Sequence, residues 1–326
     1  VCGFLDKEFL TVDPVRQRLY ASYAEFNLDF NTFSQSSTIE LAACDISNPT
    51  APVCRNGRGA GPRAPYLVVT PPPPNNCENE GAYPAVDLQS GDVYVAYEHN
   101  VDTNIFDSNC FNEPVRNVVK RIPFSRLTLP AASGGPANTA AINITSMDAA
   151  FVPGYNRFPA NDFPRIAVSH PYGTVSIVWN DARYHALGDI LMQSYHLGTL
   201  TPASSLVRLN RSTGGLHFLP ALRNADANGK LNVSWYERAT GNTTLTDVKA
   251  APGVSPRATA TPASNVLITN VPTDWNAVSS DIVPNFGDYT DNYVSATSSQ
   301  PFVGQTVAYS WSDGRNGTPQ AFFAKR

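Results

Sequence analysis

Several features are scarce in this sequence of 326 residues, and each scarcity excludes a class of protein. Charged residues make up only 15% of the chain and hydrophobic residues 42%, which argues against a disordered chain and a solvated helical bundle. The net charge of -4 gives no basis for a nucleic-acid partner. The sequence has no apolar run near 18 residues, so we expect no membrane span.

Uninterrupted windows for long helices are also missing, because 27 proline and 21 glycine residues are spread along the chain. What the sequence does contain is a series of short runs rich in Val, Ile, Tyr and Trp. Gly, Asn, Asp and Pro separate these runs, as is typical of strands and hairpins. The composition therefore predicts an all-β protein.

Cysteine is confined to the first third of the chain. The five cysteines are Cys2, Cys44, Cys54, Cys77 and Cys110, and their spacing matches no zinc motif. Cys44 with Cys54 and Cys77 with Cys110 are plausible loop disulfides, which leaves Cys2 over. The start at Val1, without a charged and then apolar leader, fits a processed mature form or a fragment. Together with several Asn-X-Ser/Thr sequons, these features favour a secreted, extracellular or periplasmic protein.

Five copies of one unit follow one another along the chain. Each copy has three strand-like runs, and the second run carries an aromatic residue at an aligned position. These residues are Tyr23, Tyr97, Trp179, Trp235 and Trp311. Their irregular spacing suits radially repeated sheets better than a solenoid. A fourth strand is readable in residues 204–211 and 264–271, whereas residues 51–80 and 127–161 are expected to be loop insertions.

We therefore predict a β-propeller with five recognisable four-stranded blades in a single domain, 1–326. The expected blade units are approximately 1–80, 81–160, 161–215, 216–283 and 284–326. Closure of the ring allows a sixth blade as an alternative, because the last unit ends at its third strand. Only residues 1–5 precede the first innermost strand, which is short for an outer strand. The other alternative is an irregular β-sandwich or two β domains.

A W-x-D-x-R string occurs twice, at Trp179–Arg183 and at Trp311–Arg315. Acids at this position recur in other units, as at Glu237, so the symmetry of a propeller would distribute them around the ring. We predict that the acid accepts backbone N–H groups at a tight turn and that the arginine reaches back to it. The tryptophans are then expected to pack in or between blades and not to form a sugar platform.

Other motifs of the repeats are shared with a known family. They are DKEFLTVD (6–13), the WNDAR and WSDGR turns, and FGDYTDN (286–292). The chain resembles the sialidase-like, BNR-repeat-type propeller proteins of bacteria over all five units. The resemblance implies the fold and a glycan-related role. The sequence departs from sialidases because it has no intact Asp-box, S-x-D-x-G-x-[TS]-[WF], and because KRIPF at 120–124 lies on a third strand.

The starts of the innermost strands place polar residues at one mouth of the predicted channel. The candidate catalytic residues there are Asp6, Asp162, Arg165, His217, Asp288 and Tyr289. Paired carboxylates with an arginine could perform acid–base glycoside cleavage, and Arg165 with Arg223 could grip a carboxylate. By the resemblance, Tyr289, beside Asp288 and Asp291, is the candidate for an activated tyrosine nucleophile. In the alternative, these polar residues only bind water and neighbouring blades.

No cofactor is predicted with certainty, but Asp6, Asp162 and Asp288 with backbone carbonyls would suit Ca²⁺. We predict an extracellular propeller that recognises a glycan or a protein partner through its mouth face as a non-catalytic module. Such a module could belong to a larger protein or assembly. The alternative function is a glycoside hydrolase of sialidase-like type. Nothing in the sequence names a sugar.

Overall fold

The computed structural model describes most of the chain. The described residues are 2–29, 34–54, 66–70, 78–101, 114–127, 136–146, 163–239, 241, 245–279, 287, 289–295 and 306–326. They form strands and three short 3₁₀ turns, Phe124–Arg126, His170–Tyr172 and Trp275–Ala277, and none of them lies in an α-helix. The all-β prediction is therefore confirmed. No helix in these ranges is long and apolar enough to cross a membrane.

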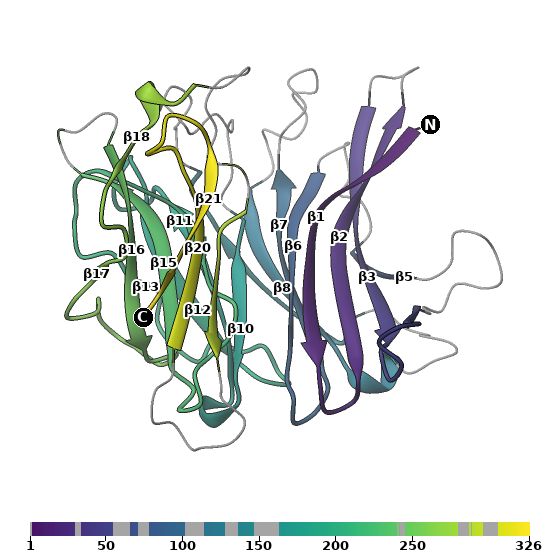
Figure 1. Cartoon of the computed structure of the whole chain (residues 1–326). Coiled ribbons are helices and arrows are strands. Elements are labelled where there is room, and N and C mark those ends of the chain that lie inside the picture. Colours follow the sequence, from purple (N-terminus) through teal and green to yellow (C-terminus); the bar gives the residue numbers. More distant parts are fainter. Residues whose placement is uncertain are drawn as a thin grey trace. The chain divides into compact units, whose positions relative to one another are not determined.

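The chain divides into two units, Val1–Ile144 with His196–Thr201, and Thr145–Tyr195 with Pro202–Arg326. The first unit contains two antiparallel sheets (Figure 1). One sheet has the order β1 (Cys2–Asp13), β2 (Arg18–Asp29), β3 (Ser34–Asp45) and β4 (Val53–Cys54), and β5 (Tyr66–Thr70) also pairs with β3. The other has the order β6 (Glu78–Val86), β7 (Val93–Val101), β8 (Arg116–Ile122) and β9 (Asn138–Asn143).

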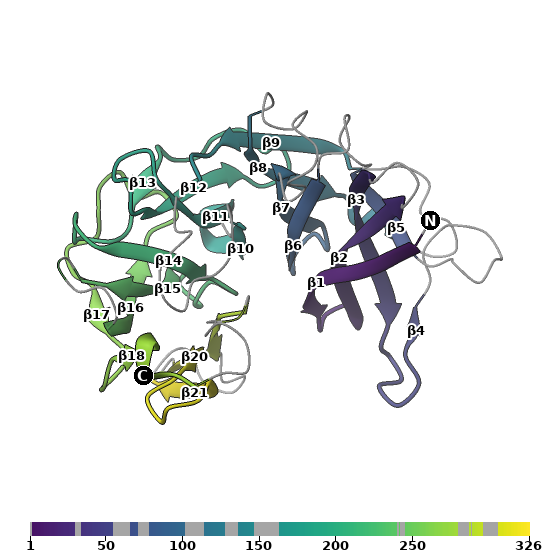
Figure 2. The same ribbon diagram turned by 90° about the horizontal axis from the view of Figure 1, so that it is seen from above.

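The second unit contains three antiparallel sheets. The first runs β10 (Arg165–Ser169), β11 (Thr174–Asp181), β12 (Asp189–His196), β13 (Val207–Arg208). The second runs β14 (Leu216–Ala221), β15 (Leu231–Arg238), β16 (Leu245–Val254), β17 (Val266–Leu267), with β18 (Thr273–Asp274) also on β16. The third runs β19 (Asp291–Ser295), β20 (Thr306–Asp313), β21 (Gln320–Lys325). Figure 2 shows the order for β14 to β17.

Five sheets whose strands follow one another in sequence order are the blades of a β-propeller, as predicted. The expected fourth strands are present as β13 and β17. Three strands lie in the expected loop insertions: β4 and β5 pair with β3, and β9 pairs with β8. All three were missed because each is a short run set among segments rich in glycine and proline. The prediction of one domain stays a prediction.

The apolar core of each unit lies between successive sheets. In the first unit, Ile39 and Leu41 of β3 belong to the same buried cluster as Val93 and Val95 of β7. In the second unit, Met192 of β12 shares a buried cluster with Trp235. Full burial of side chains of this size stabilises a fold by roughly 1.5–3 kcal/mol each, so blade packing supplies much of the driving force for folding.

The first strands of three blades carry the same β-bulge. Two residues of the first strand oppose one of the second between Asp6 and Phe9, between Glu80 and Tyr83, and between Phe218 and Ala221. Each bulge contains a residue with positive φ, at Lys7 (54°), Gly81 (66°) and Leu219 (47°). A non-glycine residue in this conformation is strained by about 1–2 kcal/mol. Bulges re-aim side chains and are common beside functional sites.

The turn between β1 and β2 is tied to the corresponding turn between β6 and β7. Asp13 Oδ1 accepts hydrogen bonds from the backbone N–H groups of Val15 and Arg16. The Arg16 guanidinium donates to Asp13 Oδ2 at 3.0 Å and to the carbonyls of Leu88 and Gln89 at 3.1 and 2.8 Å. One side chain therefore closes two turns within the first unit.

A disulfide joins Cys44 of β3 to Cys54 of β4, as predicted. The predicted partners Cys77 and Cys110 lie outside the described residues. Disulfides persist in oxidising compartments and are rare in the cytosol, so this bond is consistent with a protein that matures outside the cytosol.

Candidate functional site

The W-x-D-x-R strings form buried turns, as predicted. Trp179 Nε1 donates to Asp181 Oδ2 at 2.9 Å, and the Arg183 backbone N–H and guanidinium donate to the same carboxylate at 2.7–2.9 Å. Asp181 is fully buried. The same pattern recurs at Trp311–Arg315. These carboxylates have their acceptor sites filled by donors of their own W-x-D-x-R string and by one threonine each, Thr145 at Asp181 and Thr273 at Asp313, so they hold structure instead of a substrate.

The blade built on β14 departs from this pattern. Trp235 Nε1 still donates to the acid two positions on, Glu237 Oε2, at 3.2 Å. However, Ala239 stands where the other two turns have their arginine, and Arg238 donates to Thr246 Oγ1. The acid is also one methylene longer than aspartate. Glu237 is therefore set apart from the structural acids of the neighbouring blades.

Glu237 lies in a polar cluster with His217. Lys249 Nζ donates to Glu237 Oε1 at 2.6 Å, and Ser212 Oγ lies 2.9 Å from the same oxygen and 2.8 Å from His217 Nε2, so its one hydroxyl hydrogen can serve either acceptor. The other ring nitrogen, Nδ1, is 2.9 Å from the carbonyl oxygen of Gly188. Burial lowers the pKa of His217, and the nearby Glu237 only partly opposes this effect. The imidazole is therefore neutral near pH 7.

In the first unit, the bulge of β1 brings a buried cation between acids. Lys7 is 2% exposed, and its Nζ lies 3.2 Å from Asp6 Oδ2 and 3.5 Å from Glu80 Oε1. The Lys7 backbone N–H also donates to Asp6 Oδ1 at 2.8 Å. Asp6, predicted as a catalytic acid, is thus engaged by its neighbour, although its side chain remains 34% exposed.

In the second unit, β19 presents Asp291 between two exposed tyrosines. Its neighbours Thr290 and Asn292 face β14, donating to the carbonyls of Leu219 and Ala221 at 3.2 and 2.8 Å. Side chains alternate along a strand, so Asp291 faces away from β14. Tyr289 and Tyr293, two residues to either side of it, are 48% and 55% exposed. Tyr289, Asp291 and Tyr293 therefore form a surface at β19, called the β19 surface below, on which a carboxylate stands between two aromatic residues.

Two arginines act on Asp291. Arg223 Nε lies 3.9 Å from Asp291 Oδ2. The pKa of Asp291 is raised, because loss of hydration outweighs the opposing charges of Arg223 and Arg165. The side chain is still 43% exposed, so the desolvation comes from surrounding protein and not from complete burial. A carboxyl of this kind exchanges its proton at a less acidic pH than an ordinary aspartate.

Asp6 belongs to the first unit. Within the second unit, the predicted site residues have different partners. Arg165 and Tyr289 accompany Asp291, whereas His217 contacts Gly188 and Ser212. Arg165 is only 1% exposed and acts on Asp291 through its charge. Asp162 and Asp288 lie outside the described residues, so their predicted roles, and that of Tyr289 as a nucleophile, remain predictions.

Three residues of these clusters were not singled out from the sequence. Ser212 is only the last residue of the Asn210 sequon, and Lys249 and Tyr293 carry no motif. For the first two, the available signal was the replacement of aspartate by Glu237 without an arginine at 239.

Within the described residues, no group of three or more His, Cys, Asp or Glu side chains could hold a metal ion. The predicted calcium set included two residues outside those ranges, so the calcium site stays a prediction.

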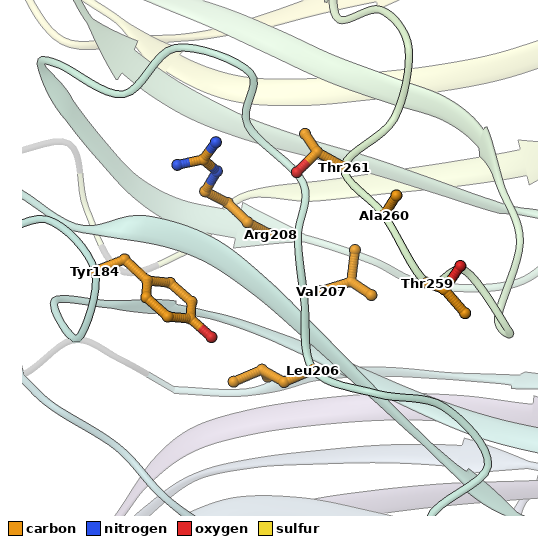
Figure 3. Close-up of a pocket in the computed structure, with 7 residues that line it drawn as sticks. All are labelled: Tyr184, Leu206, Val207, Arg208, Thr259, Ala260 and Thr261. Carbon is orange, nitrogen blue, oxygen red and sulfur yellow. The ribbon is translucent and has the colours of Figure 1, made fainter.

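A separate pocket of about 290 Å³ lies beside β13. Figure 3 shows Leu206 and Val207 between Tyr184 on one side and Thr259 and Ala260 on the other. Among the described residues that line it, Arg208 is the one with a charged side chain, and none carries a carboxylate or an imidazole. The described lining could hold a small molecule but offers no acid–base pair.

No known family model matches the sequence, and no curated protein matches it. Solved structures with a similar fold include an N-acetylgalactosamine deacetylase from F. plautii, in complex with blood group B trisaccharide. The TM-score is 0.48 at 11% identity, over 99% of this chain and 89% of that one. An α-L-arabinofuranosidase from Lactobacillus brevis gives 0.45 at 10% identity, over 98% and 90%.

Trypanosoma rangeli sialidase gives a TM-score of 0.45 at 10% identity, over 99% of this chain and 47% of that one. Identities of 10–11% and TM-scores below 0.5 carry no argument about what this chain binds or cleaves. The chain is similar in fold to these carbohydrate-active proteins, and no clear sialidase identity emerges.

Proposed function

We propose that the β19 surface of the second unit binds an acidic glycan without cleaving it. The observation that carries this proposal is the grouping of Arg223 and Arg165 with Asp291, which stands along the chain between the exposed Tyr289 and Tyr293. The Arg223 guanidinium can form a bidentate contact with an anionic group, and the charge of Arg165 acts in the same place. An anionic sugar group is the ligand that this chemistry favours.

The tyrosines supply the second half of the recognition. Exposed aromatic rings pack against the apolar faces of sugar rings, and their hydroxyl groups bond to sugar hydroxyls. Folding does not require these two rings to be exposed, because the blade core is made by the opposite face of the strand. The arrangement therefore fits a ligand that combines a carboxylate with a ring. Arg223 is 22% exposed and would make the direct ionic contact.

Glycoside hydrolysis is the second candidate function, favoured by the raised pKa of Asp291. A carboxyl that keeps its proton at a higher pH can act as a general acid, as one of the two carboxyl groups of a glycosidase does. Asp288, which lies outside the described residues, is the predicted candidate for the second carboxyl group. The disulfide supports our further proposal that the protein is secreted.

A glycan array followed by a hydrolysis assay on the bound glycans tests both functions. We expect binding to glycans with a carboxylate, a loss of at least ten-fold in affinity with Arg223→Gln, and a similar loss with Tyr293→Ser. Phe323→Ser is the matched control, because Phe323 is 66% exposed on β21 of the same sheet and its loss leaves affinity unchanged. Turnover that Asp291→Asn abolishes would favour the hydrolase, whereas binding that ignores Arg223 would overturn the site.

A further inference from the structure

The Glu237 turn can be compared with two matched turns in the same unit. Asp181 and Asp313 are each neutralised by the arginine two residues on, at 2.7 and 2.5 Å. Glu237 instead extends toward Ser212, His217 and Lys249. A purely structural turn needs none of these three partners, since the two matched turns are complete without them. The extra residues therefore call for another explanation.

The orientation of His217 is fixed by two carbonyl groups of the turn before β12. The His217 backbone N–H donates to the carbonyl of Leu187 at 3.4 Å, and ring Nδ1 lies 2.9 Å from the carbonyl of Gly188. A carbonyl oxygen only accepts hydrogen bonds, so Nδ1 carries the proton. In the neutral ring, Nε2 then has a lone pair that can accept a proton, and this lone pair faces the Ser212 hydroxyl at 2.8 Å.

Ser212 stands at the edge of an open pocket of about 380 Å³. The pocket is lined by Arg211, Ser212, Lys249, Ala263, Ser264 and Asn265. Ser212 is half-buried, so a ligand in the pocket reaches its hydroxyl. Two cationic side chains, Arg211 and Lys249, belong to the lining. The histidine itself is 1% exposed and stands behind the serine.

Glu237 completes the arrangement. Burial alone would raise its pKa, but the hydrogen bond from Lys249 and the charge of Lys249 lower it overall. The carboxylate is therefore ionised, and its Oε2 lies 3.5 Å from His217 Nε2. An imidazolium formed at His217 would be stabilised by this charge. Serine, an oriented imidazole and a carboxylate that stabilises its cation are the parts of a nucleophilic centre.

We propose that Ser212 is an activated nucleophile, with His217 as its general base, that cleaves acyl esters bound in this pocket. Ser212 Oγ forms a bond to the acyl carbon while its proton moves to His217 Nε2. The ester C–O bond then breaks, and the alcohol leaves with that proton. Water then attacks the acyl carbon and gives a proton to His217 Nε2. The bond between the acyl carbon and Ser212 Oγ breaks, Oγ takes that proton back from His217, and the acid leaves. Arg211 and Lys249 favour esters that carry negative charge.

Labelling with a fluorophosphonate probe tests the nucleophile. Attack by Ser212 Oγ on phosphorus expels fluoride and leaves a stable phosphoserine ester, which peptide mass spectrometry locates. We expect labelling at Ser212, none in Ser212→Ala, and a loss of about 10²–10⁴-fold in rate in His217→Gln, the range of a general base. The labelling rate should reach its plateau at a lower pH than the ordinary pKa of histidine allows.

Ser47 is the internal control for this experiment. Its hydroxyl bonds to a carboxylate, that of Asp45, but within the described residues no imidazole accompanies it, and we expect no label there. Turnover of 4-nitrophenyl acetate is measured in parallel, with circular dichroism to show that each variant is folded. Equal labelling of Ser47 and Ser212, or a folded His217→Gln that reacts like the wild type, would overturn the proposal. Neither result bears on glycan binding by Arg223.

Discussion

Trp311 donates its indole N–H to Oδ2 of Asp313 at 2.9 Å, from within the buried core of the second unit. The same carboxylate accepts from Arg315 and, through Oδ1, from the hydroxyl of Thr273 at 2.5 Å. Thr273 belongs to the preceding blade, so this aspartate links two sheets. The carboxylate is fully buried, and these donors replace the water that it has lost.

The first prediction is that Asp313→Ala lowers the free energy of unfolding by about 3 kcal/mol, because it leaves a guanidinium and three other donors, Trp311 Nε1, Thr273 Oγ1 and the Arg315 backbone N–H, without their acceptor. The pKa of Asp313 is lowered, since burial would raise it but Arg315, Thr273 and Trp311 more than compensate. Its stabilising contribution is present above the unfolded pKa and disappears as the pH falls through the folded pKa. Urea unfolding at pH 7 and pH 3 should show a smaller difference between the two proteins at pH 3.

The second prediction concerns Lys7 and Glu80. Lys7→Met leaves Glu80 buried without its cation, and we expect a loss of roughly 3 kcal/mol in the free energy of unfolding. The double variant Lys7→Met, Glu80→Gln removes both charges and should recover more than half of that loss. Urea unfolding of the two single variants and the double variant gives the coupling energy. Additive effects would contradict a direct interaction.

The third prediction is a pH dependence at Asp291, whose pKa is raised by loss of hydration despite Arg223 and Arg165. A carboxyl with a raised folded pKa stabilises the fold most below its unfolded pKa, and this contribution is lost as the pH rises through the folded pKa. The amide that replaces the carboxyl in Asp291→Asn does not ionise. The melting temperature of Asp291→Asn should therefore rise relative to wild type between about pH 4 and the folded pKa.

Thermal unfolding at closely spaced pH values measures this effect. Asp226→Asn is a useful control, because Asp226 instead accepts three backbone hydrogen bonds in its turn, from Gly229 through its carbonyl and from Asn228 and Lys230 through Oδ1. Loss of its carboxylate should lower the melting temperature. A wild type that gains stability over Asp291→Asn as the pH rises would show that the arginines dominate and that the pKa is lowered instead.

The blades and the roles of their turns could be predicted because they recur. Strand alternation, turn residues and the aromatic position repeat in each unit, so each copy supports the interpretation of the others. Trp179 and Asp181, taken alone, would have been ambiguous between a structural and a catalytic string. Their recurrence at Trp311 and Asp313 resolved the ambiguity before any contact was known.

The clusters were harder to predict because they depend on features without a sequence signal. The bulges at Lys7 and Leu219 place non-glycine residues at positive φ. Of the three bulges, only that of β6 is marked in the sequence by a glycine, Gly81. A bulge changes which side chains face a site. Ser212 and Lys249 meet Glu237 from segments separated along the chain, which propensity and periodicity do not reveal.

The hydrogen bonds of Arg16 couple the local unfolding of two turns in the first unit. Its guanidinium serves the turn of one blade through Asp13 and the turn of the next through Leu88 and Gln89. Gly91, with φ of 81°, leaves the space for it, since a Cβ there would lie 2.6 Å from Arg16 Nε. Opening of either turn therefore breaks hydrogen bonds of Arg16 on which the other turn depends. The two blades should therefore fray as one cooperative element at this end, with their protection from solvent exchange gained and lost together.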